Sequence, residues 1–424
     1  MCSRLLLSLP RLVLLSLLTA GTLVMPVRIP MEEQASLNNA PLNMFTRQME
    51  YMKVNGVPGV LFSDCAEISK ASEAQGVKNK GDNGEILECR PESYSENTLL
   101  IKLPYAGTNL TIHLLFNPQE PWMVPEMTFS DDRFTSTITL KDLEDQVPSL
   151  NEWDTSTDDI LAQLVHQVLQ LYRGYQLDRL EEDEILQIQY ESLLKALKIG
   201  EGDIEVSVNS TEQVSTTSSF LMRLPLSLQD VPPVLVDANP GTPNTFLQVD
   251  FPRREAAFVP KLHLSSCVES LIGEASSLAL PTVPPGIGVM DYVERIMELL
   301  EEKVRRTILS FETRKQFIAE VLCQFGCAVV EYDAERFNKI VVMMEVKDFH
   351  FLAFISLGSL FPQQHGPRVV LQSLYHNSAK EPVSKELTDL KYSSQWKPEE
   401  MVQHTKEAIL ANISSFQMSS IRTS

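Results

Sequence analysis

The chain has 424 residues, of which 43% are hydrophobic and 22% are charged, a composition typical of globular proteins rather than disordered chains. Its 36 basic and 56 acidic residues give a formal net charge of −20, and such a surface repels phosphate, which argues against direct nucleic-acid binding. No glycine-rich phosphate-binding motif occurs, which excludes the usual nucleotide-driven machines. At roughly 150 residues per domain, the length predicts about three domains.

The N-terminus has the pattern of a targeting segment. An apolar stretch from Leu12 to Met25 follows the basic residue Arg4; it has the length of a signal peptide and is too short for an ordinary membrane span. No later segment is long and apolar enough to cross a bilayer, so no membrane association is predicted. We treat residues 1–35 as an N-terminal extension, either signal-like or an artefact of gene prediction. Three tripeptides would suit N-glycosylation of a secreted protein; they begin at Asn109, Asn209 and Asn412.

Three segments then repeat one pattern: a strand, a turn that contains proline, and a second strand that ends near a serine. Because proline cannot donate to a sheet ladder, each proline marks a turn or a strand entry. The segments are residues 109–130, 245–265 and 349–373, with Pro125, Pro260 and Pro367 before the second strand. Further strand-like runs precede them at residues 99–103, 204–208, 220–224, 328–331 and 339–346.

An amphipathic helix follows each of the three segments. Apolar residues recur at i, i+3 and i+4 over residues 160–175, 292–304 and 401–413, the spacing that predicts one buried helix face. Trp153 and Trp396 precede the first and last of these helices at nearly the same distance from the preceding proline. The same order of features in two places indicates an internal repeat.

Two other stretches are interpreted structurally. A helical link is predicted over residues 180–199, and we interpret its acidic start, residues 181–184, as a solvated helix end. The six cysteines are scattered, unlike those of a disulfide scaffold. Cys323 and Cys327 end a predicted helix over residues 317–325; two cysteines do not make a zinc site, so we predict buried apolar thiols.

The pattern as a whole predicts an α+β fold of three tandem modules, each an antiparallel β-meander packed against helices. The predicted modules cover residues 36–176, residues 177–311 including the helical link, and residues 312–418, before a tail at residues 419–424.

These modules resemble ubiquitin-conjugating (E2) and RWD folds. Tyr375-His376-Asn377 is similar to the E2 His-Pro-Asn motif without its proline, and Trp396-Lys397-Pro398 is similar to the E2 Trp-x-Pro. An active E2 carries its cysteine shortly before that tryptophan, yet residues 142–146 and 385–389 contain none, and Cys267 has no such tryptophan after it. Thioester chemistry needs a thiolate. The resemblance therefore implies inactive E2-variant modules.

The chain is further similar to the BRE family over about residues 36–416. The resemblance implies a scaffold subunit of the BRISC deubiquitinase assembly and its nuclear DNA-damage counterpart. Such a subunit joins a JAMM-type zinc deubiquitinase and its pseudo-enzyme partner to a von Willebrand-type subunit, in an assembly that cuts lysine-sixty-three-linked ubiquitin chains. The runs that carry the resemblance are LPYAG (103–107), FNPQEP (116–121), VVEYDAERF (329–337), KDFHFL (347–352) and QSLYH (372–376).

The resemblance also implies that the chain itself is no enzyme and needs no cofactor. It implies a cytoplasmic and nuclear location and roles in DNA repair, apoptosis, the cell cycle and chromatin regulation. Two alternatives stay open. One is a degenerate ubiquitin-conjugating enzyme, for which His376 with Asn377 is the best pair because an asparagine there stabilises an oxyanion in E2s. The other is a secreted glycoprotein of unknown role.

No catalytic, cofactor-binding or metal-binding residue is predicted, because neither HExxH nor a JAMM-type His-x-His occurs. For partner binding, E2-variant domains often hold peptides near the last strands and the following helix. We predict that Phe361, Tyr375 and Trp396 line such a groove, and the alternative is that they are core aromatics. Ubiquitin is a further candidate partner.

Overall fold

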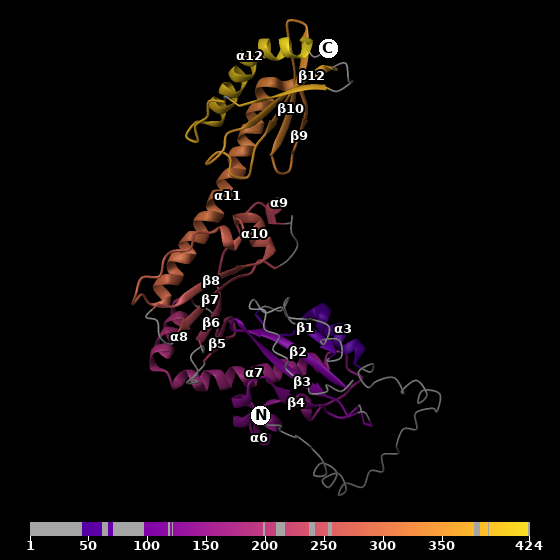
Figure 1. The fold of residues 1–424 in the computed structure, drawn as a ribbon, viewed down its shortest axis with the longest axis vertical. Helices are drawn as coiled ribbons and strands as arrows, with labels where there is room; N and C mark the ends of the chain where they lie inside the picture. The colour runs from indigo at the N-terminus through magenta and orange to yellow at the C-terminus, as the bar shows by residue number, and fades with distance from the viewer. Residues whose placement is uncertain are drawn as a thin grey trace, which may run out of the picture. The chain divides into compact units, whose positions relative to one another are not determined.

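The computed structural model confirms the α+β class, with helices packed against three antiparallel sheets (Figure 1). The chain divides into two compact units. The predicted extension, residues 1–35, and the tripeptide at Asn209 lie outside the described residues. Described are residues 45–61, 67–70, 97–117, 119–120, 122–197, 200–208, 217–236, 242–252, 257–376, 382–388 and 390–422.

The first unit contains the described residues up to Arg223 together with Phe246–Lys261 and Val283–Met290. Its first sheet has the strand order β1-β2-β3-β4. Side chains of β2 alternate between buried and half-buried, which places every second residue in the core. The strands are β1 (Glu67–Lys70), β2 (Thr98–Tyr105), β3 (Thr108–Leu115) and β4 (Glu126–Phe129).

Helices cover the core face of this first sheet. Residues of α7 (Ile160–Glu181) such as Leu164 and Val168 are buried against β2 and β3, so the first predicted helix is confirmed. Trp153 packs at the border of the same core, 6.1 Å from the Phe45 ring. The other elements here are α3 (Thr46–Asn55), α5 (Asp132–Thr137), α6 (Leu140–Gln146) and η3 (Pro148–Leu150).

The second sheet has the order β5-β6-β7-β8. The described residues of β5 are all buried, as in a sheet covered on both faces. On one face, Leu221 of β6 joins the core of the first sheet. On the other face, Phe220 meets Tyr190 of α8 (Glu184–Leu197), which confirms the helical link. The strands are β5 (Ile204–Ser207), β6 (Thr217–Arg223), β7 (Thr245–Pro252) and β8 (Val259–Leu264), with η4 at Glu201–Asp203.

The second unit is built on α11 (Val289–Phe325), a continuous helix of 37 residues. The sequence predicted two separate helical stretches here, and the absence of glycine and proline from residues 289–325 explains why the helix does not break. The predicted module boundary at residue 311 lies within α11. Shorter helices in this unit are α9 (Pro233–Val236), α10 (Ser266–Ile272), η5 (Ala275–Ser277) and η6 (Gly326–Ala328).

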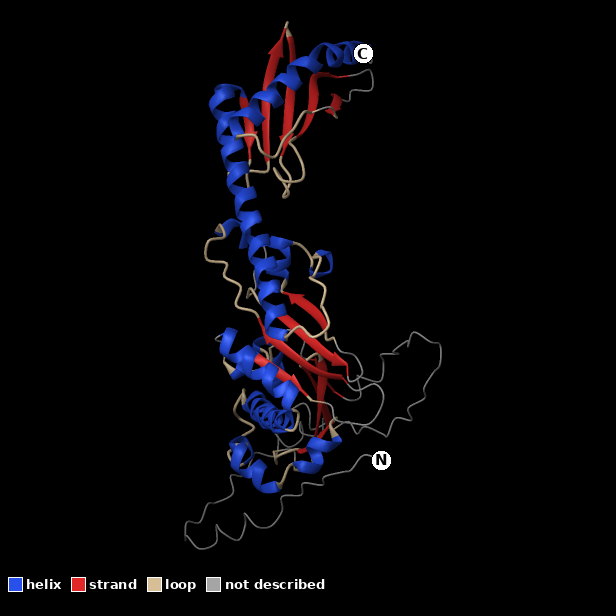
Figure 2. Cartoon of the chain, turned by 90° about the vertical axis from the view of Figure 1, so that its left-hand side faces the viewer, coloured by secondary structure: helices blue, strands red, loops and turns tan. Residues whose placement is uncertain are grey.

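The third sheet has the order β13-β12-β11-β10-β9. Figure 2 shows α12 (Pro398–Arg422) lying across one face of it. On that face, Phe416 of α12 and Phe317 of α11 are buried with Phe351 of β11. The strands are β9 (Val329–Tyr332), β10 (Lys339–Val346), β11 (Phe349–Ser356), β12 (Arg368–His376) and β13 (Pro382–Leu387).

Candidate functional site

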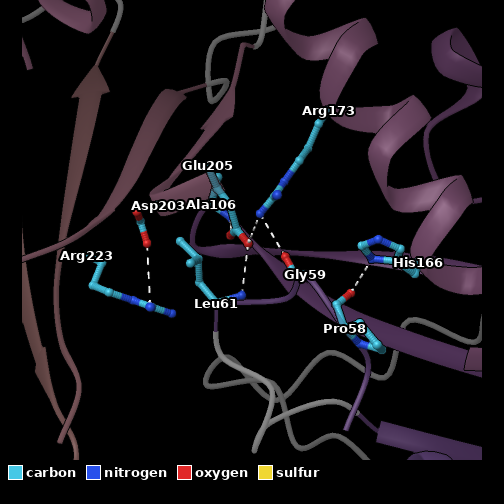
Figure 3. Close-up of polar contacts among 9 residues, drawn as sticks. All are labelled: Pro58, Gly59, Leu61, Ala106, His166, Arg173, Asp203, Glu205 and Arg223. Carbon is cyan, nitrogen blue, oxygen red and sulfur yellow. Dashed lines mark hydrogen bonds and ion pairs between the residues drawn. The ribbon is translucent and has the colours of Figure 1, made fainter. Parts of the chain in front are cut away.

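A buried polar site of the first unit centres on Glu205, a β5 residue that is 1% exposed (Figure 3). Its two carboxylate oxygens accept separate backbone hydrogen bonds, from the Ala106 N–H at 2.8 Å and from the Leu61 N–H at 3.2 Å. Arg173 of α7 lies 3.5 Å from the same carboxylate and donates to the Gly59 carbonyl at 2.8 Å. One side chain thus joins a strand of the second sheet to a turn of the first sheet, to the segment after α3 and to α7.

Burial raises the pKa of the Glu205 carboxyl, and the two backbone N–H groups and Arg173 oppose this rise. The acceptor positions of the carboxylate are already occupied by donors of the protein itself. A general base must reach the proton of its substrate, whereas the described partners of this carboxylate are Leu61, Ala106 and Arg173. Its role is to join structural elements.

The turn between β2 and β3 lies across three strands of the second sheet. Ala106 and Gly107 have φ values of 46° and 79°, as the two central residues of a type I′ hairpin require. The Ala106 N–H donates to Glu205 of β5, and Ser219 of β6 donates through Oγ to the Ala106 carbonyl. A Cβ atom on Gly107 would lie only 2.3 Å from Nε2 of Gln248 in β7. The run LPYAG therefore forms a docked hairpin tip.

Tyr105, the residue before the hairpin tip, packs against Tyr172 of α7. The Tyr105 ring lies 5.1 Å from the Tyr172 ring in an edge-on arrangement. The Tyr105 hydroxyl is hydrogen-bonded to the backbone of Val206, and burial raises its pKa far above the ordinary value. Both tyrosines therefore stay neutral in the folded protein at physiological pH.

A second chain of hydrogen bonds links α7 to both sheets. The Val208 N–H donates to Oε1 of Gln176 at 2.9 Å, and Gln176 donates through Nε2 to the Tyr172 hydroxyl at 2.8 Å. Tyr172 in turn donates to Asp131 at 3.2 Å. Asp131 also accepts from the Arg133 and Phe134 N–H groups at the start of α5. Because each polar group has a partner, the buried network stabilises the unit instead of opposing its folding.

Further contacts around the junction appear in Figure 3. Nδ1 of His166 lies 2.8 Å from the Pro58 carbonyl oxygen, and Arg223 lies 3.5 Å from Asp203. His166 thus contacts the loop after α3. Among the residues that the structure describes, no three histidine, cysteine or acidic side chains are grouped so as to hold a metal ion.

Nothing in the sequence analysis singled out Glu205. The available signal was one acidic residue inside the apolar run Ile204-Glu205-Val206, which is rare in a strand buried on both faces.

The predicted partner-binding residues occupy three different environments in the second unit. Phe361 is a fully buried core residue in edge-on contact with Phe317 at 5.6 Å. Tyr375, at the end of β12, is 50% exposed and stacks on Phe349 at 5.9 Å. Trp396 packs against the border of the core and stacks on His404 at 4.1 Å. Of the three, Tyr375 presents the most surface, and binding by this set stays a prediction.

The described cysteines divide into two groups. Cys267 of α10 is buried and lies 3.9 Å from the Val236 carbonyl oxygen. Cys323 and Cys327 are exposed, so the prediction of buried thiols is wrong for these two. They lie near the C-terminal end of α11 and in η6, where the chain leaves the helix and its residues face solvent.

Taken together, the fold defines an α+β protein made of antiparallel sheets and covering helices, with a buried polar site that joins two of the sheets. Within the described ranges, none of the helices combines the length and apolar character needed to cross a membrane. The model of the family "Brain and reproductive organ-expressed protein (BRE)" matches residues 82–377, more than half of the chain.

Two relatives extend this match. The "BRISC and BRCA1-A complex member 2" of Danio rerio is 32% identical over 323 residues, which are 75% of this chain and 82% of the relative. The protein of the same name in Branchiostoma floridae is 30% identical over 324 residues, 76% of this chain and 83% of the relative. The chain belongs to the BRE family.

Proposed function

We propose that the chain is a non-catalytic scaffold subunit of a deubiquitinase complex. The observation that supports this proposal is that the chain belongs to the BRE family. Its relatives in Danio rerio and Branchiostoma floridae are named as members of the BRISC and BRCA1-A complexes. In this proposal the chain joins a JAMM-type deubiquitinase and its pseudo-enzyme partner to a von Willebrand-type subunit, in an assembly that acts on lysine-sixty-three-linked ubiquitin. It works in the cytoplasm and nucleus and takes part in the DNA-damage response.

The absence of catalysis is supported by the lack of a cysteine at the E2 positions and by the burial of Cys267. The stretches where an E2 would carry its cysteine, residues 142–146 and 385–389, contain none. Cys267 is buried in α10, out of reach of a ubiquitin C-terminus. The buried carboxylate of Glu205 is occupied by structural hydrogen bonds. A scaffold needs none of these groups to react.

The scaffold role is supported by how the first two sheets are joined. Three strands of the second sheet contact one hairpin tip of the first, through Glu205, Ser219 and Gln248. Buried contacts of this kind hold two layers in a fixed relation. In this proposal the chain is made of E2-variant modules, and the first two sheets form one rigid block within the first unit that spaces bound partners apart.

Partner capture is proposed to involve the surface around Tyr375 and Trp396, with the buried Phe361 supporting it from the core. Tyr375→Ala is expected to weaken the association of one partner subunit by roughly tenfold, because half-exposed tyrosines are frequent hot spots of interfaces. Tyr51→Ala, which changes a tyrosine of similar exposure on α3, is the matched control. If the Tyr375→Ala and Tyr51→Ala variants bind the partner subunit with equal affinity, Tyr375 is not part of the proposed interface.

The test of the function is co-expression of the full chain with a JAMM-type deubiquitinase and its pseudo-enzyme partner, followed by affinity purification and size-exclusion chromatography. A stoichiometric complex with lysine-sixty-three-specific activity supports the proposal. A chain that elutes as a monomer in every combination contradicts it. A thioester assay with ubiquitin and its activating enzyme checks the non-catalytic role, since a reducible adduct lost on Cys267→Ser would show an active E2.

A further inference from the structure

Arg314 of α11 is a buried cation without a fitting partner. It is 7% exposed, and across the described part of the chain its Nε has no hydrogen-bond acceptor. Its guanidinium carbon lies 5.9 Å from the centre of the Phe311 ring. Arg173 of the first unit also has an Nε without an acceptor, but its guanidinium meets both Glu205 and the Gly59 carbonyl. A buried guanidinium N–H without an acceptor opposes folding.

Asp333, the acidic side chain that acts electrostatically on Arg314, is hydrogen-bonded elsewhere. Its Oδ1 accepts from the Glu335 and Arg336 N–H groups, both at 3.0 Å, and so closes the turn between β9 and β10. Its charge favours the protonated state of Arg314, while burial lowers the pKa of that guanidinium. Asp333 therefore compensates Arg314 only across a distance and makes no ion pair with it.

Arg314 lies near the C-terminal end of β9, since it interacts electrostatically with Asp333, the residue after this strand. Phe311, one turn before it in α11, packs edge-on against Phe337 of the β9–β10 turn at 5.5 Å. Among the described strands, β9 forms the end of this sheet. Val330 and Tyr332 of β9 are 59% and 42% exposed. An edge strand offers unpaired backbone N–H and C=O groups, which an extended peptide can pair with.

We propose that β9 is the docking strand for an extended segment of a partner protein, and that Arg314 binds a carboxylate of that segment. Val330 and Tyr332 supply the apolar contacts, and the sheet edge supplies the backbone hydrogen bonds. A planar guanidinium pairs with a carboxylate through two parallel hydrogen bonds, which specifies an acidic residue or a C-terminus. The inference rests on the proposed scaffold function, because the partner is another subunit of that assembly.

The proposal predicts opposite effects of one substitution on folding and on binding. Arg314→Met keeps most of the volume and removes the charge. In the isolated full chain it is expected to leave the melting temperature unchanged or to raise it, because no internal ion pair is lost. In the assembled complex the same change is expected to weaken capture of the segment by roughly tenfold or more. A residue with a purely structural role would lower both.

The experiment places a photo-crosslinking amino acid at Val330 of the full chain in the co-expressed complex, with Leu309 of α11 as the matched exposed control. Mass spectrometry then identifies the crosslinked segment. The proposal expects crosslinks from Val330 to a segment that contains an acidic side chain or a C-terminus, and their loss with Arg314→Met but not with Arg305→Met. Conversion of that carboxyl to an amide in the partner is expected to reproduce the loss.

Four outcomes overturn the inference. A lower melting temperature of isolated Arg314→Met would show that the guanidinium is satisfied within the chain. Crosslinks from Val330 that persist unchanged in Arg314→Met would separate the arginine from docking. An assembled wild-type complex without crosslinks from Val330 would refute the β9 site and leave the scaffold function intact, whereas failure of the wild-type chain to assemble at all would refute both.

Discussion

The substitution Glu205→Ala tests whether one buried carboxylate holds the first two sheets together. It removes the acceptor of the Leu61 and Ala106 N–H groups and the partner of Arg173. The Glu205 side chain is fully buried and that of Arg173 is 12% exposed, so solvent neither screens the interaction nor replaces it.

The magnitude follows from these losses. An orphaned buried N–H costs about 1–3 kcal/mol, and breaking a buried ion pair by removing one partner costs about 3–5 kcal/mol. These effects overlap, and release of the carboxylate from burial offsets part of them. We expect a loss of about 3–5 kcal/mol in the free energy of unfolding, and a melting temperature lower by roughly 6–20 °C at about 2–4 °C per kcal/mol.

The assay is urea unfolding in a Trp396→Phe background, where Trp122 and Trp153 of the first unit report its fluorescence. Hydrogen exchange at the Ala106 and Leu61 amides measures the same junction locally. Glu152→Ala, at an exposed position, is the control and should change the free energy of unfolding by under about 0.5 kcal/mol. A loss below about 1 kcal/mol for Glu205→Ala, with unchanged exchange at both amides, would refute the reasoning.

Three other predictions concern the same unit. Gly107→Ala should lower the free energy of unfolding by about 1–3 kcal/mol in thermal melts, because φ is +79° and the new Cβ meets Gln248; Gly202→Ala, with nothing within 4 Å, should not. Because the pKa of Tyr105 is raised in the folded protein, its contribution to the free energy of unfolding is fully present below about pH 10, the ordinary tyrosine value. This contribution is lost as the pH rises above that value. Tyr105→Phe should therefore flatten the alkaline loss of stability in pH-dependent urea titrations, and an unchanged slope would contradict this. Asp131→Ala should cost about 1–2 kcal/mol through the α5 cap and the Tyr172 hydroxyl, whereas Asp132→Ala should cost clearly less in the same titrations.

Much of the secondary structure could be predicted because it depends on local pattern. The alternation of Leu99, Ile101 and Leu103 is enough for a strand, since neighbouring side chains point to opposite faces. The 3.6-residue spacing identified α7 and α12 in the same way. The prediction failed at α11, where two apolar stretches belong to one helix, and at Cys323 and Cys327, whose exposure depends on where that helix ends.

The sequence by itself thus determined the α+β class, the strands and the main helices, and its motifs indicated the family. Only the tertiary structure decided the junction at Glu205, because its partners Leu61 and Ala106 lie 144 and 99 residues away along the chain. It also decided that Phe361 is buried whereas Tyr375 is half-exposed, and that Arg314 is buried without an acceptor for its Nε. The physical reason is common to all three: burial and pairing depend on segments brought together by folding, which local spacing does not encode.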